Sequence, residues 1–265
     1  MSVRSGRLAL LLVLAAPASA LAQGFSYAPG TGQYRITSSM KGAQEVMGQR
    51  QEMESSSNQL VTIAVARGGK DTLNLTTTLD SIQITGPMGM TPPGLDKLAG
   101  TKVTAKISPT GQVYSANGPS ADSLPNAEQL VEEMSNVLPK VRASMKAGAT
   151  WTDTVTRKGS QGGLEIERKI VASYAVAGDT TVGGQKAWKI TRKAVTTMTG
   201  SGAQNGQPMT LEGTSNGSGT MVVTPAGSFL GYTNEEDVNL KVLIVANGME
   251  VGVTQNAVTK VEKVK

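Results

Sequence analysis

Hydrophobic and polar residues alternate with a period of two along most of the chain. The stretch 101–108, TKVTAKIS, places valine, alanine and isoleucine on one parity and lysine and threonine on the other. The stretch 164–176, LEIERKIVASYAV, keeps most of its apolar residues on even positions. Because residues two apart on a β-strand point to the same side, both stretches predict strands with one buried and one wet face.

One segment changes the phase of this alternation. In the stretch 72–84, TLNLTTTLDSIQI, the apolar residues occupy odd positions up to Leu79 and even positions from Ile82 onward. One extra residue in a strand produces such a shift, so the sequence predicts a β-bulge or bend near Asp80–Ser81.

Turns are marked by Asn–Gly dipeptides. Both residues tolerate positive φ angles, which tight hairpins require. The sequence therefore predicts turns at three places, namely Asn205–Gly206, Asn216–Gly217 and Asn247–Gly248.

A single stretch has helical spacing. NAEQLVEEMSNVLPKVRASM, which begins at position 126, repeats apolar residues every three or four positions. This predicts a helix over about 126–146, with Leu130, Met134 and Leu138 on its apolar face. Pro139 should kink the helix or end its first part.

Two distant stretches are similar to each other. ISPTGQVYSANG begins at Ile107 and VTPAGSFLGYTN begins at Val223, and both place Pro and Gly where a turn requires them. Tyr34 and Trp151, each opening a predicted strand, recur at nearly the same interval. We interpret this as a duplicated β unit, with chance reuse of a common turn as the alternative. The predicted organisation has two β units, at 34–118 and 151–234. A helical connector at 119–150 joins them, and a C-terminal hairpin at 235–265 follows.

Together these patterns predict a mostly β fold. The two similar units form one strongly bent antiparallel sheet or open barrel, and the helix at about 126–146 covers it. We expect residues 23–265 to form a single β-rich domain.

The first residues have the pattern of a secretory signal. MSVRSGRLALLLVLAAPASALAQ has a basic start, a short apolar run and small residues before a cleavage site. Cleavage between Ala22 and Gln23 is predicted, with cleavage after Ala20 as the alternative. Residues 1–22 are then the signal peptide, and the protein is exported to the periplasm of a bacterium or secreted. The remaining chain is expected to contain no integral membrane span, because no later apolar run is long enough.

The composition excludes several chemistries. The chain contains no histidine and no cysteine. This removes the usual proton shuttle at neutral pH, the Ser–His and Cys–His nucleophiles, and nearly all zinc and copper(II) sites. We therefore expect no enzyme activity, no cofactor and no metal. The net charge of +5 is mild and does not indicate nucleic-acid binding.

Two motifs carry weak chemical signals. GTSNG places Ser215 in a G-x-S-x-G pattern, but a nucleophile elbow needs a following helix and a histidine partner. The acidic runs Glu132–Glu133 and Glu235–Asp237 leave a carboxylate-dependent hydrolase as one alternative.

Methionine and leucine with few aromatic residues can line an adaptable apolar cavity. We expect Leu130, Met134 and Leu138 to line such a cavity between the helix and the sheet. The leading hypothesis is a non-enzymatic exported protein that binds a hydrophobic small molecule or lipid. The alternative is a structural or scaffolding protein of the envelope, with a filled core and a protein partner.

The stretch 138–155, LPKVRASMKAGATWTDTV, resembles an uncharacterised family of exported bacterial β-rich proteins and lipoproteins. The resemblance implies an exported β-rich fold and no particular activity. A bent sheet under a helix is also similar to the periplasmic lipoprotein-carrier (Lol-type) architecture, which shelters acyl chains. This chain lacks the lipobox cysteine of most such relatives. The positions that match the family motif are Leu138, Pro139, Lys146, Gly148 and Trp151.

Overall fold

The computed structural model describes residues 25–86, 95–120, 127–161, 163–204 and 206–264. The predicted cleavage site between Ala22 and Gln23 lies outside the described residues. A short 3₁₀ helix, η2, spans Leu95–Leu98.

The described residues form a single antiparallel sheet of eleven strands. Its order is β5-β4-β3-β2-β1-β11-β10-β9-β8-β7-β6, so β5 and β6 are its two edges and the sheet is not closed. This confirms the predicted mostly β, strongly bent open sheet with one helix. The strands are β1 (Gly30–Val46), β2 (Gln49–Arg67), β3 (Leu73–Thr85), β4 (Lys102–Ile107), β5 (Val113–Asn117), β6 (Thr150–Gln161), β7 (Leu164–Val182), β8 (Gln185–Gln204), β9 (Gln207–Val223), β10 (Phe229–Ile244) and β11 (Met249–Lys263).

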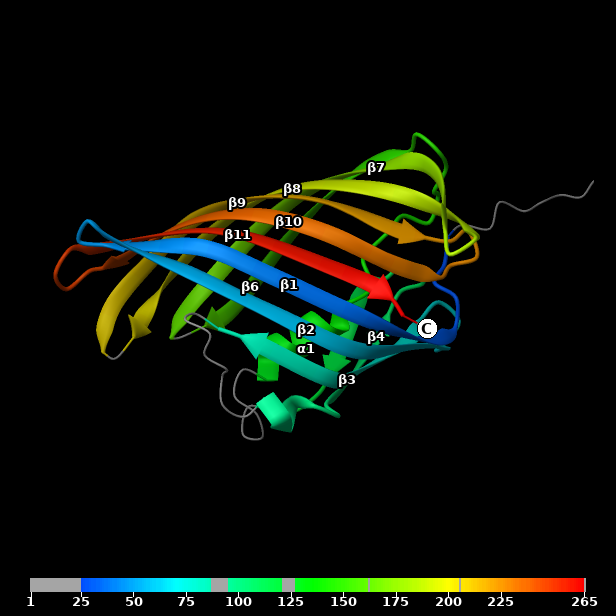
Figure 1. Ribbon diagram of the computed structural model, residues 1–265, viewed down its shortest axis with the longest axis horizontal. Helices are drawn as coiled ribbons and strands as arrows, with labels where there is room; N and C mark the ends of the chain where they lie inside the picture. The colour runs from blue at the N-terminus through cyan, green and yellow to red at the C-terminus, as the bar shows by residue number, and fades with distance from the viewer. Residues whose placement is uncertain (1–24, 87–94, 121–126, 162, 205, 265) are drawn as a thin grey trace, which may run out of the picture.

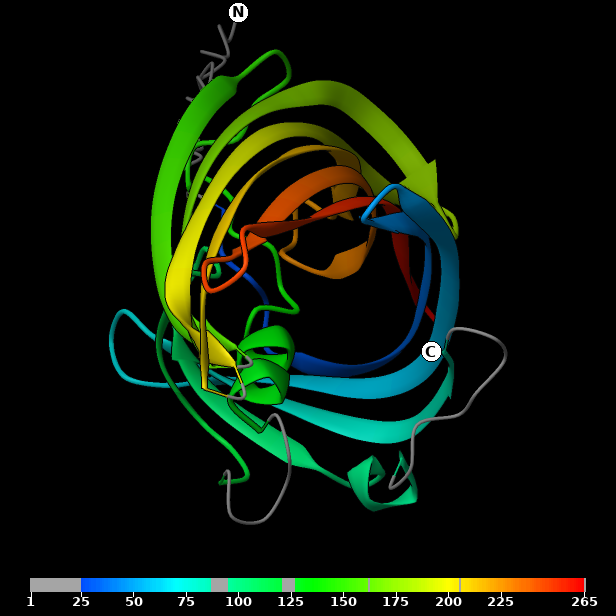
Figure 2. The same ribbon diagram turned by 90° about the vertical axis from the view of Figure 1, so that its left-hand side faces the viewer.

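The sheet consists of two meanders that meet in its middle. β1 to β5 run outward to one edge, and β11 back to β6 run outward to the other. The first and last strands pair over thirteen residues, from Tyr34 opposite Lys263 to Val46 opposite Val251. Figure 1 shows blue β1 beside red β11, and Figure 2 shows the strands curving around the helix.

The two faces of the sheet differ in polarity. On β10, the inward residues Val238, Leu240 and Val242 are half-buried, whereas Asp237 and Lys241 on the outward face are exposed. The same alternation holds along β7 and β4, as the sequence predicts. The concave face is therefore largely apolar and the convex face meets water.

The β-bulge predicted near Asp80–Ser81 is confirmed. In the β2–β3 ladder, Val61 pairs with Leu79 and Leu60 pairs with Ser81, so Asp80 is the extra residue. The shift keeps Ile82 on the concave side, in contact with the main core. The Asp80 carboxylate accepts hydrogen bonds from Thr62 and from a glutamine side chain on β1.

The turn predicted at Asn216–Gly217 is wrong. Gly217 lies inside β9, paired with Ala194 on one side and Glu236 on the other. Continuous pairing on both edges of β9 overrides the local turn preference of this dipeptide. Gly206 and Gly248 do have positive φ angles and lie between strands, although Asn205 is outside the described residues.

The helix, α1, spans Ala127–Ser135 and is shorter than the predicted 126–146. Asn136 ends it, because its side chain donates to the Glu132 carbonyl oxygen at 2.8 Å. Pro139 then disfavours helical geometry in the residue before it. The chain continues to β6 without regular structure but keeps four apolar side chains buried, namely Val137, Leu138, Val141 and Met145.

The two similar sequence stretches form turns with the same hydrogen bonds. Ser108 N donates to Gln112 O, and Thr224 N donates to Ser228 O, both at 2.8 Å. The segment before β1 lies between these turns: Tyr27 N donates to Pro109 O and Ala28 N to Gly227 O. The segment thus fastens both halves of the sheet at one end, which we term the base. The duplication itself stays a prediction.

We expect Gly227→Ala to lower the free energy of unfolding by about 2–3 kcal/mol. Gly227 has a φ of +90°, and an added Cβ would overlap the Ser26 carbonyl oxygen. Urea unfolding followed by circular dichroism measures the change. The matched control is Gly252→Ala, because a Cβ there meets nothing within 4 Å. Equal stability of the two variants would contradict this role for the turn.

Candidate functional site

The space between α1 and the base of the sheet is a filled core. Met134 and Leu138 are buried in the main apolar cluster, and Leu130 packs against it. Thr77 on β3 donates to the Met134 carbonyl oxygen at 3.0 Å, which fixes the helix against the sheet. The ligand-binding role of Leu130, Met134 and Leu138 stays a prediction, since their packing is that of a core.

A small cavity remains at the base. It has a volume of about 70 Å³ and is lined by residues that include Tyr34, Ile63, Leu138 and Phe229. Water in the liquid occupies about 30 Å³ per molecule, so this space suits one or two waters rather than an organic ligand.

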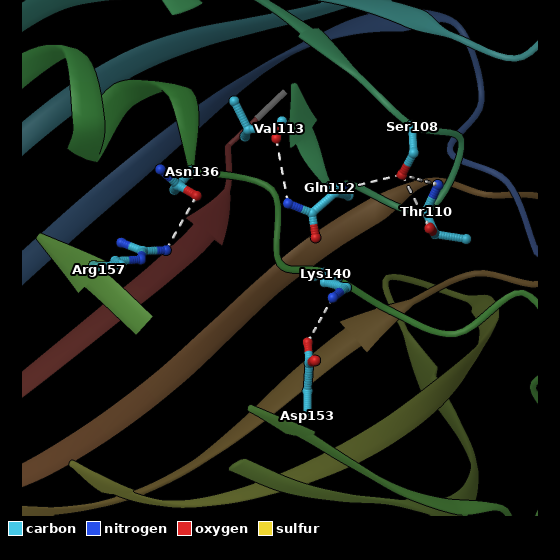
Figure 3. A network of polar contacts seen from close by, with 8 residues as sticks. All are labelled: Ser108, Thr110, Gln112, Val113, Asn136, Lys140, Asp153 and Arg157. Carbon is cyan, nitrogen blue, oxygen red and sulfur yellow. Dashed lines mark hydrogen bonds and ion pairs between the residues drawn. The ribbon is translucent and has the colours of Figure 1, made fainter. Parts of the chain in front are cut away.

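The connector after α1 is fastened across the gap between the two sheet edges. On β6, Arg157 forms an ion pair with Glu132 and a hydrogen bond with Asn136, and Lys140 pairs with Asp153 at 2.7 Å (Figure 3). Toward the other edge, the backbone of the connector bonds to the β4–β5 turn. These contacts hold α1 over the base half of the concave face, where it packs against β3, β4 and β5.

A belt of polar side chains crosses the middle of the concave face. Ser215 Oγ donates to the Glu236 carboxylate, and Arg192 donates to Asn234 at 3.2 Å. Ser38 and Thr259 share a hydrogen bond in the same belt.

Burial and two nearby charged side chains shift the pKa of Tyr232, which lies next to this belt. Burial raises the pKa of Tyr232, Glu133 of α1 raises it further and Arg192 lowers it. Tyr232 therefore lies within electrostatic range of both Arg192 in the belt and Glu133 on the helix.

Ser215 does not form a nucleophile elbow. It lies inside β9, is only 1% exposed and is bonded to Glu236. A nucleophile must be accessible at a strand-to-helix turn, with a base beside it.

Beyond the belt, a second apolar surface lies on β7, β8, β9 and β10. Three of its residues are buried and four are partly exposed, and all face the concave side. Two glycines form part of its floor: a Cβ at Gly213 would overlap Leu240, and one at Gly200 would press on Ile166. We call this surface the trough; its residues are Leu164, Ile166, Met198, Met209, Leu211, Leu240 and Val242.

The carboxylates singled out in the sequence lie on different faces. Glu132 and Glu236 belong to the concave side, whereas Glu235 and Asp237 point outward and accept hydrogen bonds from Asn256. This placement does not bring the acidic runs into one cleft. In the part of the chain that the structure describes, no group of three acidic side chains could hold a metal ion.

Sequence reasoning missed the trough as a site. Alternation identifies its residues as inward-facing, but it does not indicate which inward residues the helix leaves uncovered. The signal that could locate it is a set of glycines at inward positions of two neighbouring strands, even-numbered in β8 and odd-numbered in β9.

No family model and no curated protein matches this sequence. Among the helices of the described residues, none has the length and apolarity needed to cross a membrane.

Solved structures show distant similarity. OccK2 (OpdF) of Pseudomonas aeruginosa aligns with a TM-score of 0.32 at 7% identity, covering 92% of this chain and 100% of that one. A mutant porin of Rh. blastica gives 0.29 at 8% identity, with 86% and 99% covered. The hypothetical lipoprotein YmcC of Escherichia coli gives 0.22 at 10% identity, with 88% of each chain covered.

We expect Tyr34→Phe to destabilise the protein at pH 8 by about 1 kcal/mol, because Tyr34 donates a buried hydrogen bond to Phe229 O at 2.9 Å. Burial raises the pKa of Tyr34 to about 12. The unfolded chain releases this proton near pH 10, so the tyrosine's contribution is complete below pH 10 and is lost as the pH rises to about 12. Urea unfolding of both proteins between pH 8 and 12 measures this. A difference that stays constant with pH would contradict it.

Proposed function

We propose that this protein is a non-enzymatic exported protein that binds an elongated apolar molecule, such as an acyl chain, in the trough. The observation that supports this most is that partly exposed apolar side chains line the concave face beyond α1, while most outward side chains of the same strands are polar or charged. Apolar surface that the fold itself does not cover is a feature of ligand and partner sites. The resemblance of the stretch 138–155 supports export to the periplasm or secretion.

The dimensions of this surface suit a chain-like ligand. On β10, inward apolar residues run from Val238 to Ile244. At about 3.3 Å per residue this run is about 20 Å long, which matches an extended acyl chain. Each methylene removed from water contributes about 0.8 kcal/mol, part of which offsets the lost freedom of the ligand.

The polar belt borders the trough on one side. Glu236 and Asn234 provide hydrogen-bonding groups there, and Ser215 already orients Glu236. An amphipathic ligand would place its polar end at the belt and its apolar chain along the trough.

The second candidate is a structural protein of the envelope without a small ligand. The filled core between α1 and the base favours it, because the cavity there holds only about 70 Å³. The two candidates differ in whether an apolar molecule binds to the trough.

We expect Val242→Asp to weaken binding of pyrenedodecanoic acid at least about tenfold, because the ligand would bury an unpaired carboxylate. Fluorescence titration of the chain from Gln23 onward measures the affinity. Leu243→Asp is the matched control, since Leu243 is adjacent on β10 but on the convex face and 36% exposed.

Either of two results would contradict the trough as the site. One is equal affinity of the Val242→Asp variant and the wild type. The other is a wild-type protein that binds no probe, which would favour the structural candidate.

A further inference from the structure

The tip of the β1–β2 hairpin carries an apolar residue in an unfavourable conformation. Met47 has a φ of +52° and is 82% exposed. The left-handed region favours Gly, Asn and Asp, and a long side chain gains nothing there from the fold. The neighbouring β10–β11 hairpin uses Asn247–Gly248 at its tip. Packing within the fold therefore does not explain an exposed methionine at this strained position, which indicates another role for Met47.

The two hairpin tips lie at the same end of the sheet, opposite the base. β1 and β11 are paired, and their last pair is Val46 with Val251. Figure 1 shows both turns projecting together at its left-hand side. Val245 on the second tip is 52% exposed and Leu243 is 36% exposed. Both tips therefore present apolar side chains to the surroundings.

A recess of about 570 Å³ separates the tips. It is lined by residues of both hairpins, including Met47, Gly48, Gly248 and Met249. Met249 pairs with Ile244 at the end of the β10–β11 ladder, two residues beyond Val242 of the trough. Glu45, Asn247 and Glu250 also line the recess, so the side chains of Met47 and Met249 lie there beside polar ones.

The three positive side chains around the tips are each paired with an acidic one, and Glu45 is a further acid there. Lys41 lies 3.5 Å from Glu54, Arg50 lies 2.7 Å from Glu52 and Lys241 lies 2.6 Å from Glu250. Glu45 lies opposite Arg50 in the β1–β2 ladder. This collar offers no excess of positive charge to anionic lipids or acidic proteins.

We propose that the two hairpin tips insert shallowly into the surface of a lipid bilayer and that zwitterionic lipid suffices for binding. A narrow protruding tip with apolar side chains, above a collar without excess positive charge, suits insertion between the headgroups of zwitterionic lipids. The proposed membrane contact depends only on the residues of the two tips. Its use for passing an apolar ligand between the bilayer and the trough rests on the proposed function.

Flotation of the chain from Gln23 onward with phosphatidylcholine vesicles tests the proposal. We expect the wild type to float and Met47→Asn to reduce the bound fraction at least about fivefold. Asparagine tolerates the left-handed conformation, so the same substitution should keep or raise the melting temperature. A purely structural role of Met47 would not move these two readouts in this way. Val182→Asp is the control, since Val182 is 42% exposed beside the β7–β8 turn at the opposite end.

Three outcomes would overturn the membrane proposal. They are a wild type that does not float, a Met47→Asn variant that floats like the wild type, and flotation that requires phosphatidylglycerol and disappears in high salt. Binding of pyrenedodecanoic acid distinguishes a failure of the membrane proposal from a failure of the trough as the ligand site. Met47→Asn should keep probe binding, whereas Val242→Asp should lose probe binding and still float.

Discussion

A sheet with one apolar face must cover that face, and here the cover is much shorter than the sheet. α1 has nine residues and is about 14 Å long, whereas a strand such as β1, with seventeen residues, extends about 55 Å. The helix and its connector cover the base half of the concave face and leave the other half uncovered. The filled core, the polar belt and the trough all follow from this difference in length.

The concave face is divided by chemistry as well as by cover. Near the base, the stacked rings of Tyr34 and Phe229 belong to the same apolar core as Met134 of α1. In the middle of the concave face, Ser215 donates a hydrogen bond to the carboxylate of Glu236. Beyond them, leucine and methionine dominate, with glycines beneath them. Each strand therefore changes character along its length, and the two ends of the molecule meet different surroundings.

Much of the fold could be predicted from the sequence because β-sheet periodicity is a local property. The alternation in β4 and β7 and the bulge at Asp80 both follow from which parity is apolar. The end of α1 at Ser135 and the strand at Asn216–Gly217 could not, because the first depends on the Asn136 side chain and the second on pairing with β8 and β10. The trough is harder still to predict from the sequence, because it lies where the helix does not cover the apolar face of the sheet.

The pairing of β1 with β11 sets the order in which the molecule can be completed. The central seam joins residues from opposite ends of the chain, such as Ile36 with Val261. Closing so long a loop is slow and entropically costly, so the seam forms after shorter-range hairpins. A ribosome releases β1 long before β11 emerges. One edge of β1 therefore stays unpaired until β11 is available, and anything that shields this edge in the incomplete chain would favour the correct fold.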